Sequence, residues 1–373
     1  MSARVCHITS AHSRYDVRIF RKQCVSLANS GYETYLLVND EHDDEIKDNV
    51  RIISTKLQAE NRIKRFWIAN RKLRQKALDL GADIYHLHDP DLLPLGNKLK
   101  ACGKKVVFDS HEDIPRQIRD KIWINFFLRK IIALLYEKYE ASSLGRYDAV
   151  VSVTPHIVER LRLLNSNTYL ITNYPVISLD GSIQKRNHNR IICFAGGISP
   201  QWNHDKIIEA ISDIDSVKYI LAGKLSKQYE KKLIALPGWN KVDYRGVVDF
   251  THVKKIYEAS SVGMALNYCT QLGGSGTLGN TKLFEYMEAG LPVVCTNYSL
   301  WEEIVKTYAC GFVVDPHDVN AIRNAIETLL DNPQVALDMG SSGRDAVKEK
   351  YNWKTQEKKF LDLYSDLSGK CEA

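Results

Sequence analysis

The chain has 373 residues, of which 26% are charged and 44% are hydrophobic, and its formal net charge is +6. The length is too great for one ordinary hydrophobic core and fits two domains of roughly 150 to 200 residues each. The composition is ordinary for a soluble globular protein. The mildly basic balance permits an anionic substrate or an anionic membrane surface as a partner, and it establishes neither.

Three sequence features argue against broad classes of protein. No apolar run reaches the length that spans a membrane, because Arg129 and Lys130 interrupt the longest candidate, WINFFLRKIIALLY. The first residues, MSARVCHITS, lack the apolar core of a signal peptide. The eight cysteines show no CxxC spacing, which indicates reduced, mostly buried thiols in a cytosolic protein.

Strand-like runs alternate with helix-length amphipathic segments along the chain, which predicts an α/β architecture with parallel sheets. In the first half the predicted strands are Arg4–Thr9, Thr34–Val38, Val50–Ser54, Ile84–Leu87, Lys105–Asp109, Ala149–Val153 and Thr168–Ile171. The predicted helices between them are Val17–Ser30, Ile63–Leu80, Leu92–Ala101, Ile118–Leu144 and Pro155–Leu164.

A polar stretch without periodicity, residues 177–189, is the predicted linker. After it the predicted strands lie in IICFAGG, VKYILAG, VDYRG, VGMALN, PVVC and GFVV, and the predicted helices are Asp205–Ile214, Gln228–Leu236, Thr251–Ala259, Lys282–Ala289, Leu300–Lys306, Val319–Leu330 and Gln334–Lys350. The expected domains are residues 1–176 and 190–352, with a last helix over residues 353–373. Because ligands bind at the carboxyl ends of parallel strands, functional residues are expected in the loops that follow strands.

One stretch of the second half, GGSGTLGNTKLFEYMEAGLPVV, joins a glycine-rich loop to a short helix and then to a buried strand. Asn280 or Thr281 is a natural N-cap for the helix, and Lys282 and Glu285 then share one face. The free N–H groups at the helix start and the charge of Lys282 suit a diphosphate, while Glu285 can accept two hydrogen bonds from a diol such as a ribose. A simple surface Lys/Glu pair after a flexible loop is equally open.

Polar side chains also follow the strands of the first half. The candidates lie in three loops: SAHSRYDVRIF with His12, Arg14, Asp16 and Arg18; HDPDLLP with His88, Asp89 and Asp91; and DSHEDIP with Asp109, His111, Glu112 and Asp113. Asp16 is expected to cap the helix that follows it. The second and third loops predict acid/base groups or substrate contacts, because loops at these strand ends collect ligand contacts.

Other chemistries have weaker signals. His86, His88, Asp89 and His111 are all metal-ligand types, but no HExxH or similar spacing accompanies them, so acid/base or hydrogen-bonding roles are preferred to a metal site. The absence of GxSxG disfavours a serine hydrolase, and the absence of GxGxxG after the first strand disfavours a dehydrogenase.

Two segments of the first half, Gln58–Leu78 and Arg116–Lys138, combine basic residues with aromatic and aliphatic ones. Such helices can lie on an anionic bilayer. Core-packing helices with a solvated basic face fit the pattern about as well. A nucleic-acid partner is disfavoured, because no recognised binding module accompanies the charge.

The ordered set of motifs resembles the GT-B glycosyltransferases, specifically the retaining enzymes of glycosyltransferase family four. YRGVV, KLFEYMEAGLPVV, EEIV and GFVVDPHD, between Tyr244 and Leu330, are similar to the family's donor-site elements in order and spacing. TSAHSRYDVRIFRK, HDPDLLP and FDSHED are similar to the acceptor domain of bacterial members that build polysaccharides. The resemblance implies two Rossmann-like parallel-sheet domains facing across a cleft, with the last helix crossing back to the first domain.

The resemblance also implies roles for single residues. Glu285 matches the second glutamate of the family's motif of two glutamates separated by seven residues, whose role is to hold the nucleotide ribose. The amides of Gly279 to Thr281 would meet the phosphates, and the backbone around Val247 and Val248 would meet the base. His111 is similar to the family histidine that contacts the donor sugar near the reacting centre.

The sequence departs from the family pattern in two places. Thr277 stands where the first glutamate is expected, and a hydroxyl cannot replace the charge of a carboxylate. Gly197 and Trp202 stand where the family has an arginine and a lysine for the diphosphate. Lys282, and less directly Lys224, are the proposed replacements.

The implied activity is transfer of a hexose, with retention and without a metal or other cofactor, from a nucleotide sugar to a glycan or polyprenyl-diphosphate-linked acceptor. The pathway would be envelope polysaccharide (O-antigen or capsule) assembly in the cytoplasm, at the inner face of the membrane, with a UDP-sugar favoured over a GDP-sugar as donor. Asp89 and His111 would orient the donor sugar or the acceptor. The acceptor-side candidates are His12, Asp16, Arg18 and His88. A GT-B sugar-nucleotide epimerase and a non-catalytic nucleotide-sugar-binding subunit are the alternatives.

Overall fold

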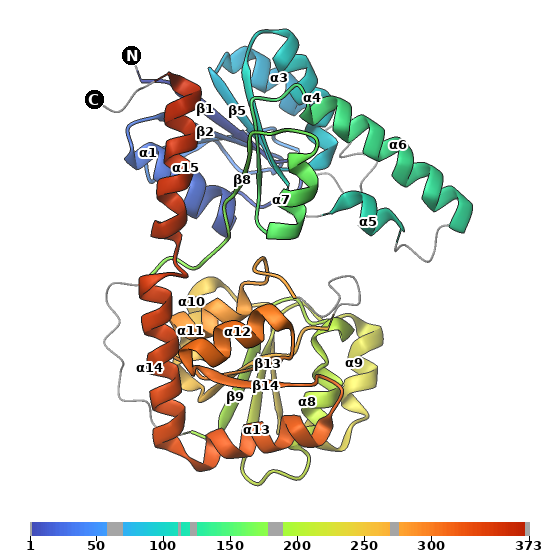
Figure 1. Ribbon diagram of the computed structural model, residues 1–373, viewed down its shortest axis with the longest axis vertical. Helices are drawn as coiled ribbons and strands as arrows, with labels where there is room; N and C mark the ends of the chain where they lie inside the picture. The colour runs from blue at the N-terminus through green and yellow to red at the C-terminus, as the bar shows by residue number, and fades with distance from the viewer. Residues whose placement is uncertain are drawn as a thin grey trace. The chain divides into compact units, whose positions relative to one another are not determined.

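The computed structural model describes residues 2–57, 70–110, 113–119, 125–177, 189–268 and 276–369. The chain forms two compact units, one comprising Met1–Asn173 with Trp353–Ala373 and the other Tyr174–Asn352. Each unit is built on a largely parallel sheet flanked by helices (Figure 1), which confirms the predicted α/β class. The first unit ends before the expected boundary at residue 176, and the last helix belongs to it.

The first unit contains an eight-stranded sheet in the order β3-β4-β2-β1-β5-β6-β7-β8. Its strands are β1 (Arg4–Ile8), β2 (Glu33–Val38), β3 (Glu45–Lys47), β4 (Val50–Ser54), β5 (Ile84–Leu87), β6 (Lys105–Ser110), β7 (Ala149–Ser152) and β8 (Thr168–Leu170). Only β3 runs antiparallel to its neighbour, β4. The sequence did not predict β3, because this short and mostly exposed edge strand has no buried alternation to mark it.

The helical segments of the first unit are η1 (a π-helix, Val17–Cys24), α1 (Val25–Asn29), α3 (Asn70–Leu80), η3 (Pro90–Leu92), α4 (Leu93–Ala101), α5 (Ile114–Arg119), α6 (Phe126–Leu144), α7 (Pro155–Arg162) and α15 (Trp353–Ser368). The single helix predicted over Ile118–Leu144 is wrong. The Asn125 side chain accepts a hydrogen bond from the Phe127 N–H and starts a separate helix there.

The second unit contains a six-stranded, fully parallel sheet in the order β11-β10-β9-β12-β13-β14. Its strands are β9 (Ile191–Ala195), β10 (Lys218–Ala222), β11 (Val242–Gly246), β12 (Val262–Ala265), β13 (Val293–Thr296) and β14 (Gly311–Val314). Its helical segments are η4 (Pro200–Trp202), α8 (His204–Ile211), α9 (Lys227–Ile234), η5 (Pro237–Lys241), α10 (Phe250–Ala259), α11 (Lys282–Glu288), α12 (Ser299–Tyr308), α13 (Val319–Asp331) and α14 (Pro333–Glu349).

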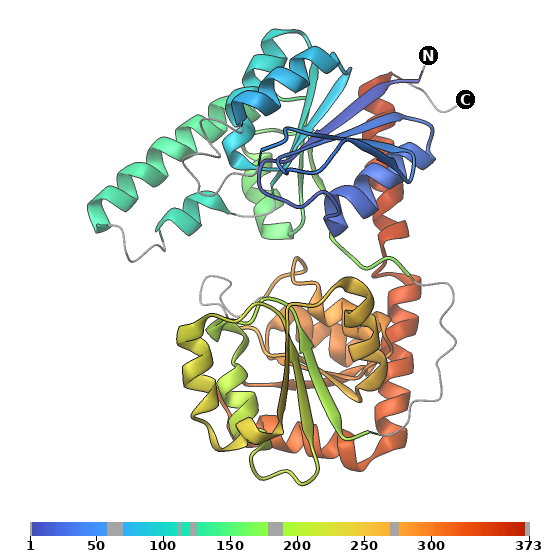
Figure 2. The same cartoon turned by 180° about the vertical axis from the view of Figure 1, so that it is seen from behind.

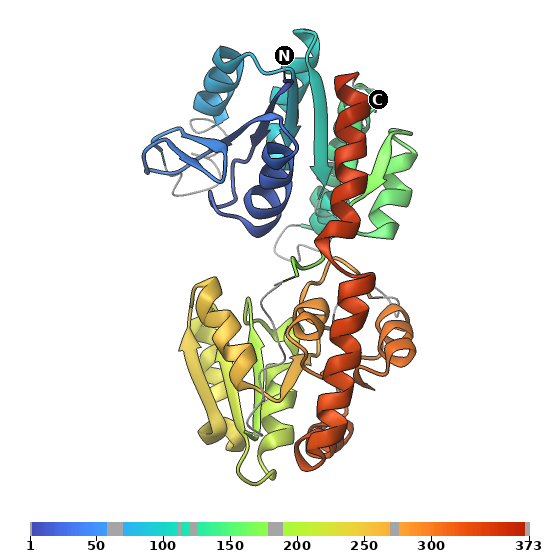
Figure 3. The same cartoon turned by 90° about the vertical axis from the view of Figure 1, so that its left-hand side faces the viewer.

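Both faces of each sheet are buried, as Figures 2 and 3 show from other sides. In β9, Ile192 and Phe194 pack with α8 and α13 on one face, while Cys193 and Ala195 pack with α11 and α12 on the other. In the first unit, Phe360 and Tyr364 of α15 pack with residues of β1, β5 and β6. Figure 3 shows α15, in red, alongside the sheet. Strands buried on both faces read as continuous apolar runs, which is why the sequence predicted them well.

Two further predictions concern the cysteines and membrane spans. Five of the described cysteines are buried thiols, as expected from their apolar surroundings, and Cys102 is exposed. Over the described ranges, no helix combines the length and the hydropathy needed to cross a bilayer.

The strand order places a switch point in each sheet. β1 lies between β2 and β5, and β9 lies between β10 and β12, so successive connections leave these strands toward opposite edges. In open parallel sheets, ligands bind outside the carboxyl ends of the strands at such a point. The loops that follow these strands are therefore the expected location of a functional site in each unit.

Candidate active site

The carboxylate of Glu285 lies in the first turn of α11 and is held by three donors. Its Oε1 accepts a hydrogen bond from the Thr281 hydroxyl at 2.5 Å, and its Oε2 accepts from the Tyr257 hydroxyl at 2.8 Å and from Lys282 Nζ at 2.6 Å. The side chain is 27% exposed. Burial by itself raises the pKa of Glu285, but the Lys282 ammonium and the two hydroxyls hold the pKa below its usual value. Glu285 is therefore an oriented anion that is still reached by solvent.

The backbone after β9 comes close to Lys282. A Cβ built on Gly196 would lie 3.0 Å from Lys282 Cε. Gly223, after β10, has a φ of +143°, and a Cβ there would lie 1.7 Å from the Gly196 carbonyl oxygen, so the position requires glycine. The loop after β9 therefore lies against both the Lys282 side chain and the loop after β10.

The Lys282–Glu285 contact is also what the simpler interpretation of the sequence predicts, a Lys/Glu pair one turn apart. The pair is not a solvated surface pair, because the Lys282 side chain is only 16% exposed. An ammonium group has three donors. The described contacts of Lys282 Nζ reach Glu285 and, at 3.5 Å, the Tyr257 hydroxyl.

Thr277 stabilises the loop before α11. Its hydroxyl accepts a hydrogen bond from the Gly279 N–H at 3.0 Å, and its carbonyl accepts one from Trp301 Nε1 at 2.8 Å. The side chain at the first-glutamate position thus forms a hydrogen bond with the backbone of its own loop. Gly273 and Gly274 of the same loop lie outside the described residues.

Asn280 and Thr281 divide the two functions expected of an N-cap. Asn280 Oδ1 accepts a hydrogen bond from the Lys282 N–H at 3.2 Å, so it satisfies a backbone donor at the helix start. The Thr281 hydroxyl instead donates to Glu285. Either residue fitted the sequence pattern, and the structure shows that Asn280 caps the backbone while Thr281 orients the carboxylate.

Other predicted residues lie on neighbouring loops of the same unit. Lys224 is exposed after β10, and its carbonyl accepts a hydrogen bond from the Ile198 N–H at 3.1 Å. Val247, just after β11, is 77% exposed, whereas Val248 packs partly against the core. These positions flank the strand ends, but no described contact joins them to Glu285.

The two positions that lack the family cations have local roles. Gly197 is exposed in the loop after β9. The Trp202 ring packs against Phe194, with 4.8 Å between ring centroids. Neither position supplies positive charge.

In the first unit, Asp89 joins the loops that follow β1 and β5. Its Oδ2 accepts hydrogen bonds from the Thr9 hydroxyl and the Ser10 N–H, both at 2.7 Å, and its Oδ1 lies 3.3 Å from His12 Nδ1. Burial raises the pKa of Asp89, but His12, Thr9 and Ser10 bring the pKa below its usual value. Burial lowers the pKa of His12, and the Asp89 carboxylate outweighs it and raises that pKa. A His12–Asp89 pair, which is charged when His12 is protonated, therefore lies at the switch point, with the His12 side chain 35% exposed.

Arg18 forms a buried ion pair with Asp109. Its Nε and Nη2 donate to the two carboxylate oxygens at 2.9 and 3.0 Å, and its Nη1 donates to the Ile171 carbonyl at 2.8 Å. Gln23 Nε2 donates to the same carboxylate at 2.7 Å. Arg18 and Asp109 are 4% and 0% exposed, so this acceptor-side candidate is placed in the core of its unit.

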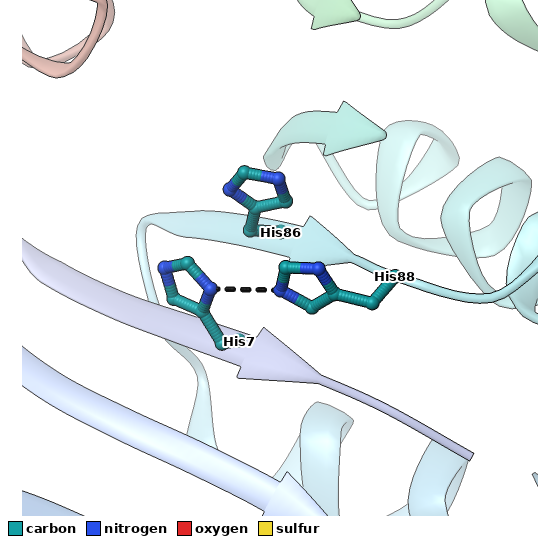
Figure 4. Close-up of side chains that lie close together, drawn as sticks. All are labelled: His7, His86 and His88. Atoms are coloured by element: carbon teal, nitrogen blue, oxygen red, sulfur yellow. Dashed lines mark hydrogen bonds between the residues drawn. The ribbon is translucent and has the colours of Figure 1, made fainter. Parts of the chain in front are cut away.

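His88 belongs to a buried stack of histidines that includes His7 and His86. His7 Nδ1 and His88 Nε2 are 2.9 Å apart and point toward each other from β1 and the end of β5 (Figure 4). The His86 and His88 rings are stacked, with 4.6 Å between centroids and 9° between planes. The Tyr364 hydroxyl bonds to His86 Nδ1 at 2.7 Å and to His7 Nε2 at 3.2 Å.

Among the described side chains, this stack is a candidate metal site. The donor atoms of its three histidines all lie within 4.8 Å of one another. Stacked rings direct their lone pairs in parallel planes, whereas a tetrahedral metal site needs them to converge on one point. The close nitrogens are also joined by hydrogen bonds. The arrangement fits a hydrogen-bonded core network better than a metal centre, and it places His88, an acceptor-side candidate, inside that network.

Two further candidates of the first unit are Asp16 and His111. The Asp16 side chain accepts hydrogen bonds from the N–H groups of Arg18 and Ile19, which confirms it as the cap of η1. His111 lies outside the described residues. The sequence pattern did not indicate His7 or Tyr364, because neither stands in a loop after a strand.

Two family models match successive parts of the chain. The model for Glycosyltransferase Family 4 matches residues 17–173, and the model for Glycosyl transferases group 1 matches residues 178–346. A glycosyltransferase of Methanocaldococcus jannaschii is 25% identical over 199 residues, which are 51% of this chain and 49% of that protein. The chain spans about half or less of the length of the first curated relatives it matches.

Two solved structures share the fold over nearly the whole chain. Sucrose-phosphate synthase from Thermosynechococcus elongatus has a TM-score of 0.73 at 18% identity, covering 99% of this chain and 100% of that one. Anabaena HepE in complex with UDP and glucose has a TM-score of 0.69 at 14% identity, covering 98% and 100%. At these identities the likeness establishes the fold alone.

Proposed function

Because the chain belongs to the GT-B glycosyltransferases of the family 4 type, we propose that it transfers a hexose, with retention, from a nucleotide sugar to a glycan or lipid-linked acceptor in envelope polysaccharide assembly. The observation that carries the proposal is the Glu285 carboxylate. It is anionic, oriented by Thr281 and Tyr257, and 27% exposed at the start of α11. Thr281, Tyr257 and Lys282 already fill three of its roughly four acceptor sites, so one ribose hydroxyl can donate to the site that remains, and a second can do so when Lys282 turns from Glu285 to a diphosphate.

Lys282 is the proposed partner of the diphosphate. It is proposed in place of the cations that Gly197 and Trp202 do not supply, and its side chain lies against Gly196 in the loop after β9. Lys224 is a second, exposed cation on the same side of the sheet. In this proposal the ammonium groups and backbone amides stabilise the leaving diphosphate, and no metal or other cofactor takes part.

A UDP-sugar is the preferred donor. The backbone at Val247 and Val248 would meet the base. Anabaena HepE, which shares the fold, is known in complex with UDP and glucose, and this complex supports the same class of ligand here. GDP- and ADP-sugars are the competing donors.

The proposed reaction is a front-face substitution at the anomeric carbon. The bond from this carbon to the phosphate oxygen breaks, the bond to the acceptor oxygen forms on the same face, and the departing phosphate oxygen takes the acceptor proton. Asp89 would act by fixing His12 toward the acceptor, since its own oxygens are bound within the unit. His111 would contact the donor sugar. Product NMR should show a retained anomeric configuration, and an inverted linkage would refute this mechanism.

The most direct experiment is a thermal-shift screen with UDP, GDP, ADP and their common sugars. A ligand that binds only the native state stabilises it by about 2.7 kcal/mol at a hundredfold excess over Kd. Lys282→Ala should lose this shift and raise the donor KM or abolish turnover. Lys306→Ala, which removes an exposed lysine from α12 of the same unit, is the matched control. Nucleotide binding by none of the three series, or normal kinetics in Lys282→Ala, would discard the proposed site.

One observation favours a second candidate, a non-catalytic nucleotide-sugar-binding subunit. Thr277 bonds to the Gly279 amide, so the first-glutamate position supplies no carboxylate for the donor sugar hydroxyls. Calorimetric binding of a sugar nucleotide without hydrolysis or transfer would support this candidate.

A further inference from the structure

Helix α6 presents large apolar side chains to solvent. Phe127 is 73% exposed, Leu135 62% and Ile131 54%. The other exposed apolar residues of this helix are Phe126, Leu128, Ile132, Leu134 and Tyr139. Soluble units rarely leave so much contiguous apolar surface in water, and where they do it marks an interaction site.

Phe127, Ile131 and Leu135 define one face of the helix, and the other exposed apolar residues lie on both sides of it. At about 3.6 residues per turn, Phe127, Ile131 and Leu135 fall on the side opposite Ala133 and Glu140, which are buried. The buried side packs against α4 and α5. Figures 1 and 2 show α6 running out from the body of its unit, with its N-terminal part farthest from the sheet. The apolar face is thus turned away from the protein that supports the helix.

The charges around this face are mainly positive. Lys130 and Lys138 are exposed on α6, and Lys130 Nζ lies 4.3 Å from the centre of the Phe126 ring. The acidic residues within α5 and α6 are Glu137, which pairs with Arg119, and Glu140, which pairs with Arg160. An apolar face that Lys130 flanks and that Lys138 ends, seven residues after Ile131, with its acids neutralised, is complementary to an anionic lipid surface.

The other basic amphipathic segment is built differently. In the described part of it, α3, Leu73 and Ala77 are 0% exposed and face the core of the unit. Its basic side chains are therefore the solvated face of a packing helix. Of the two segments that the sequence indicated for a membrane, only α6 turns its large apolar side chains outward within the described residues.

We propose that α6 docks the protein on an anionic bilayer as an interfacial helix. It would lie in the plane of the headgroups, with Phe127, Ile131 and Leu135 among the acyl chains and the ammonium groups of Lys130 and Lys138 at the lipid phosphates. The inference deepens the proposed function and rests on it for one point, the lipid-linked acceptor, which such a surface would present.

The test is sedimentation of the full chain with vesicles, without nucleotide or acceptor. The protein should bind vesicles of phosphatidylcholine with phosphatidylglycerol, bind pure phosphatidylcholine more weakly, and be released by salt. Ile131→Ser/Leu135→Ser should lower the partition coefficient at least about tenfold. Leu163→Ser, at the end of α7 and 86% exposed in the wild type, removes equivalent surface elsewhere and should bind normally. Lys130→Gln/Lys138→Gln should lose the preference for anionic lipid, roughly tenfold.

Three results would overturn the docking role of α6: no vesicle binding by the wild type, full binding by Ile131→Ser/Leu135→Ser, or a dimer in sedimentation velocity that this double variant disperses without any lipid binding. The last result would make α6 a contact between copies of the chain. The UDP thermal shift of the same variant separates the two proposals, because it reports the fold and the donor site and does not depend on α6.

Discussion

Both units carry charged side chains near the carboxyl ends of their strands, and the two units use them differently. In the first unit, Asp109 and Asp89 are buried, and their oxygens accept hydrogen bonds from Arg18 of η1 and from the loop after β1. In the second unit, Glu285 and Lys282 form a partly buried pair that solvent still reaches. Charged groups in this region thus stabilise the first unit, whereas in the second unit they leave a partly accessible charged pair.

The physical reason is the cost of burying charge. A carboxylate taken out of water must have its oxygens satisfied, so Asp109 requires both Arg18 and Gln23. Glu285 also accepts hydrogen bonds from three donors, but part of its side chain remains hydrated. Several polar residues that the sequence suggests as functional candidates in the first unit are therefore bound to one another in its core. Substitutions in each unit can test this contrast.

The largest effect is expected from breaking the buried pair. Arg18→Ala should lower the free energy of unfolding of the first unit by about 3–5 kcal/mol, because Asp109 would remain as an uncompensated buried charge. Urea denaturation followed by hydrogen exchange would assign the loss to this unit. Arg4→Ala, which opens an exposed pair with Glu33, should change little. Equal effects of the two substitutions would contradict a structural role for Arg18.

The next effect concerns ligand binding rather than stability. Glu285→Gln should reduce kcat/KM for the donor roughly 10- to 100-fold, since a charged acceptor for the ribose is replaced by a neutral one. The free energy of unfolding should fall much less than in Arg18→Ala, because the site remains partly hydrated. Steady-state kinetics with the donor found in the thermal-shift screen would measure it. A large loss of stability with unchanged kinetics would place Glu285 with Asp109 as a structural carboxylate.

A moderate effect is expected from acid. Burial holds the pKa of His7 well below its usual value, with His86 adding to the shift, and burial lowers the pKa of His204 from 6.5 to about 3. Because these folded-state pKa values lie below the unfolded value, the unfolded chain takes up protons first. Stability present above pH 6.5 is then lost as pH falls toward 3, by up to about 1.4 kcal/mol per pH unit for each histidine.

Urea titrations between pH 7 and pH 4.5 would measure this slope. His204→Gln should be less stable at pH 7 and show a flatter slope in the second unit, whereas His317→Gln, at an exposed position, should keep the wild-type slope. An unchanged slope in His204→Gln would show that other groups govern the acid sensitivity.

The smallest effect comes from two helix caps, one in each unit. Asp16 caps η1, and Asp318 caps α13 by accepting from the N–H groups of Asn320 and Ala321. Replacing either by alanine should cost about 1 kcal/mol of stability. A transfer assay would separate them: if Asp16→Ala loses activity that Asp318→Ala retains, Asp16 also contacts the acceptor.

Most of the fold could be predicted from the sequence because doubly buried strands such as β9 and β12 leave unbroken apolar runs. The errors arose where local signals compete. The helical periodicity of Ile118–Leu144 does not predict the break before Phe126. A short edge strand such as β3 has no buried alternation from which it could be predicted.

The site divides along the same line. Asp16 and the Lys282–Glu285 pair follow from local spacing, which the sequence contains. Arg18–Asp109 and the contact of Tyr364 with His7 depend on residues far apart in the chain, so no spacing rule could join them. A strand-end loop can thus be recognised from its residues, whereas the direction in which each side chain turns is decided by tertiary packing.

The bridge from Tyr364 to His7 and His86 also bears on the order of events during synthesis. The core of the first unit includes residues from both ends of the numbering, while the second unit is one continuous segment, Tyr174–Asn352. Because translation proceeds from the N-terminus, the middle of the polypeptide has all its own partners on leaving the ribosome, and the earlier segment must wait for α15. His7 and His86, which are buried in the complete fold, are thus hydrated or covered by other groups until α15 has been synthesised and packs against them.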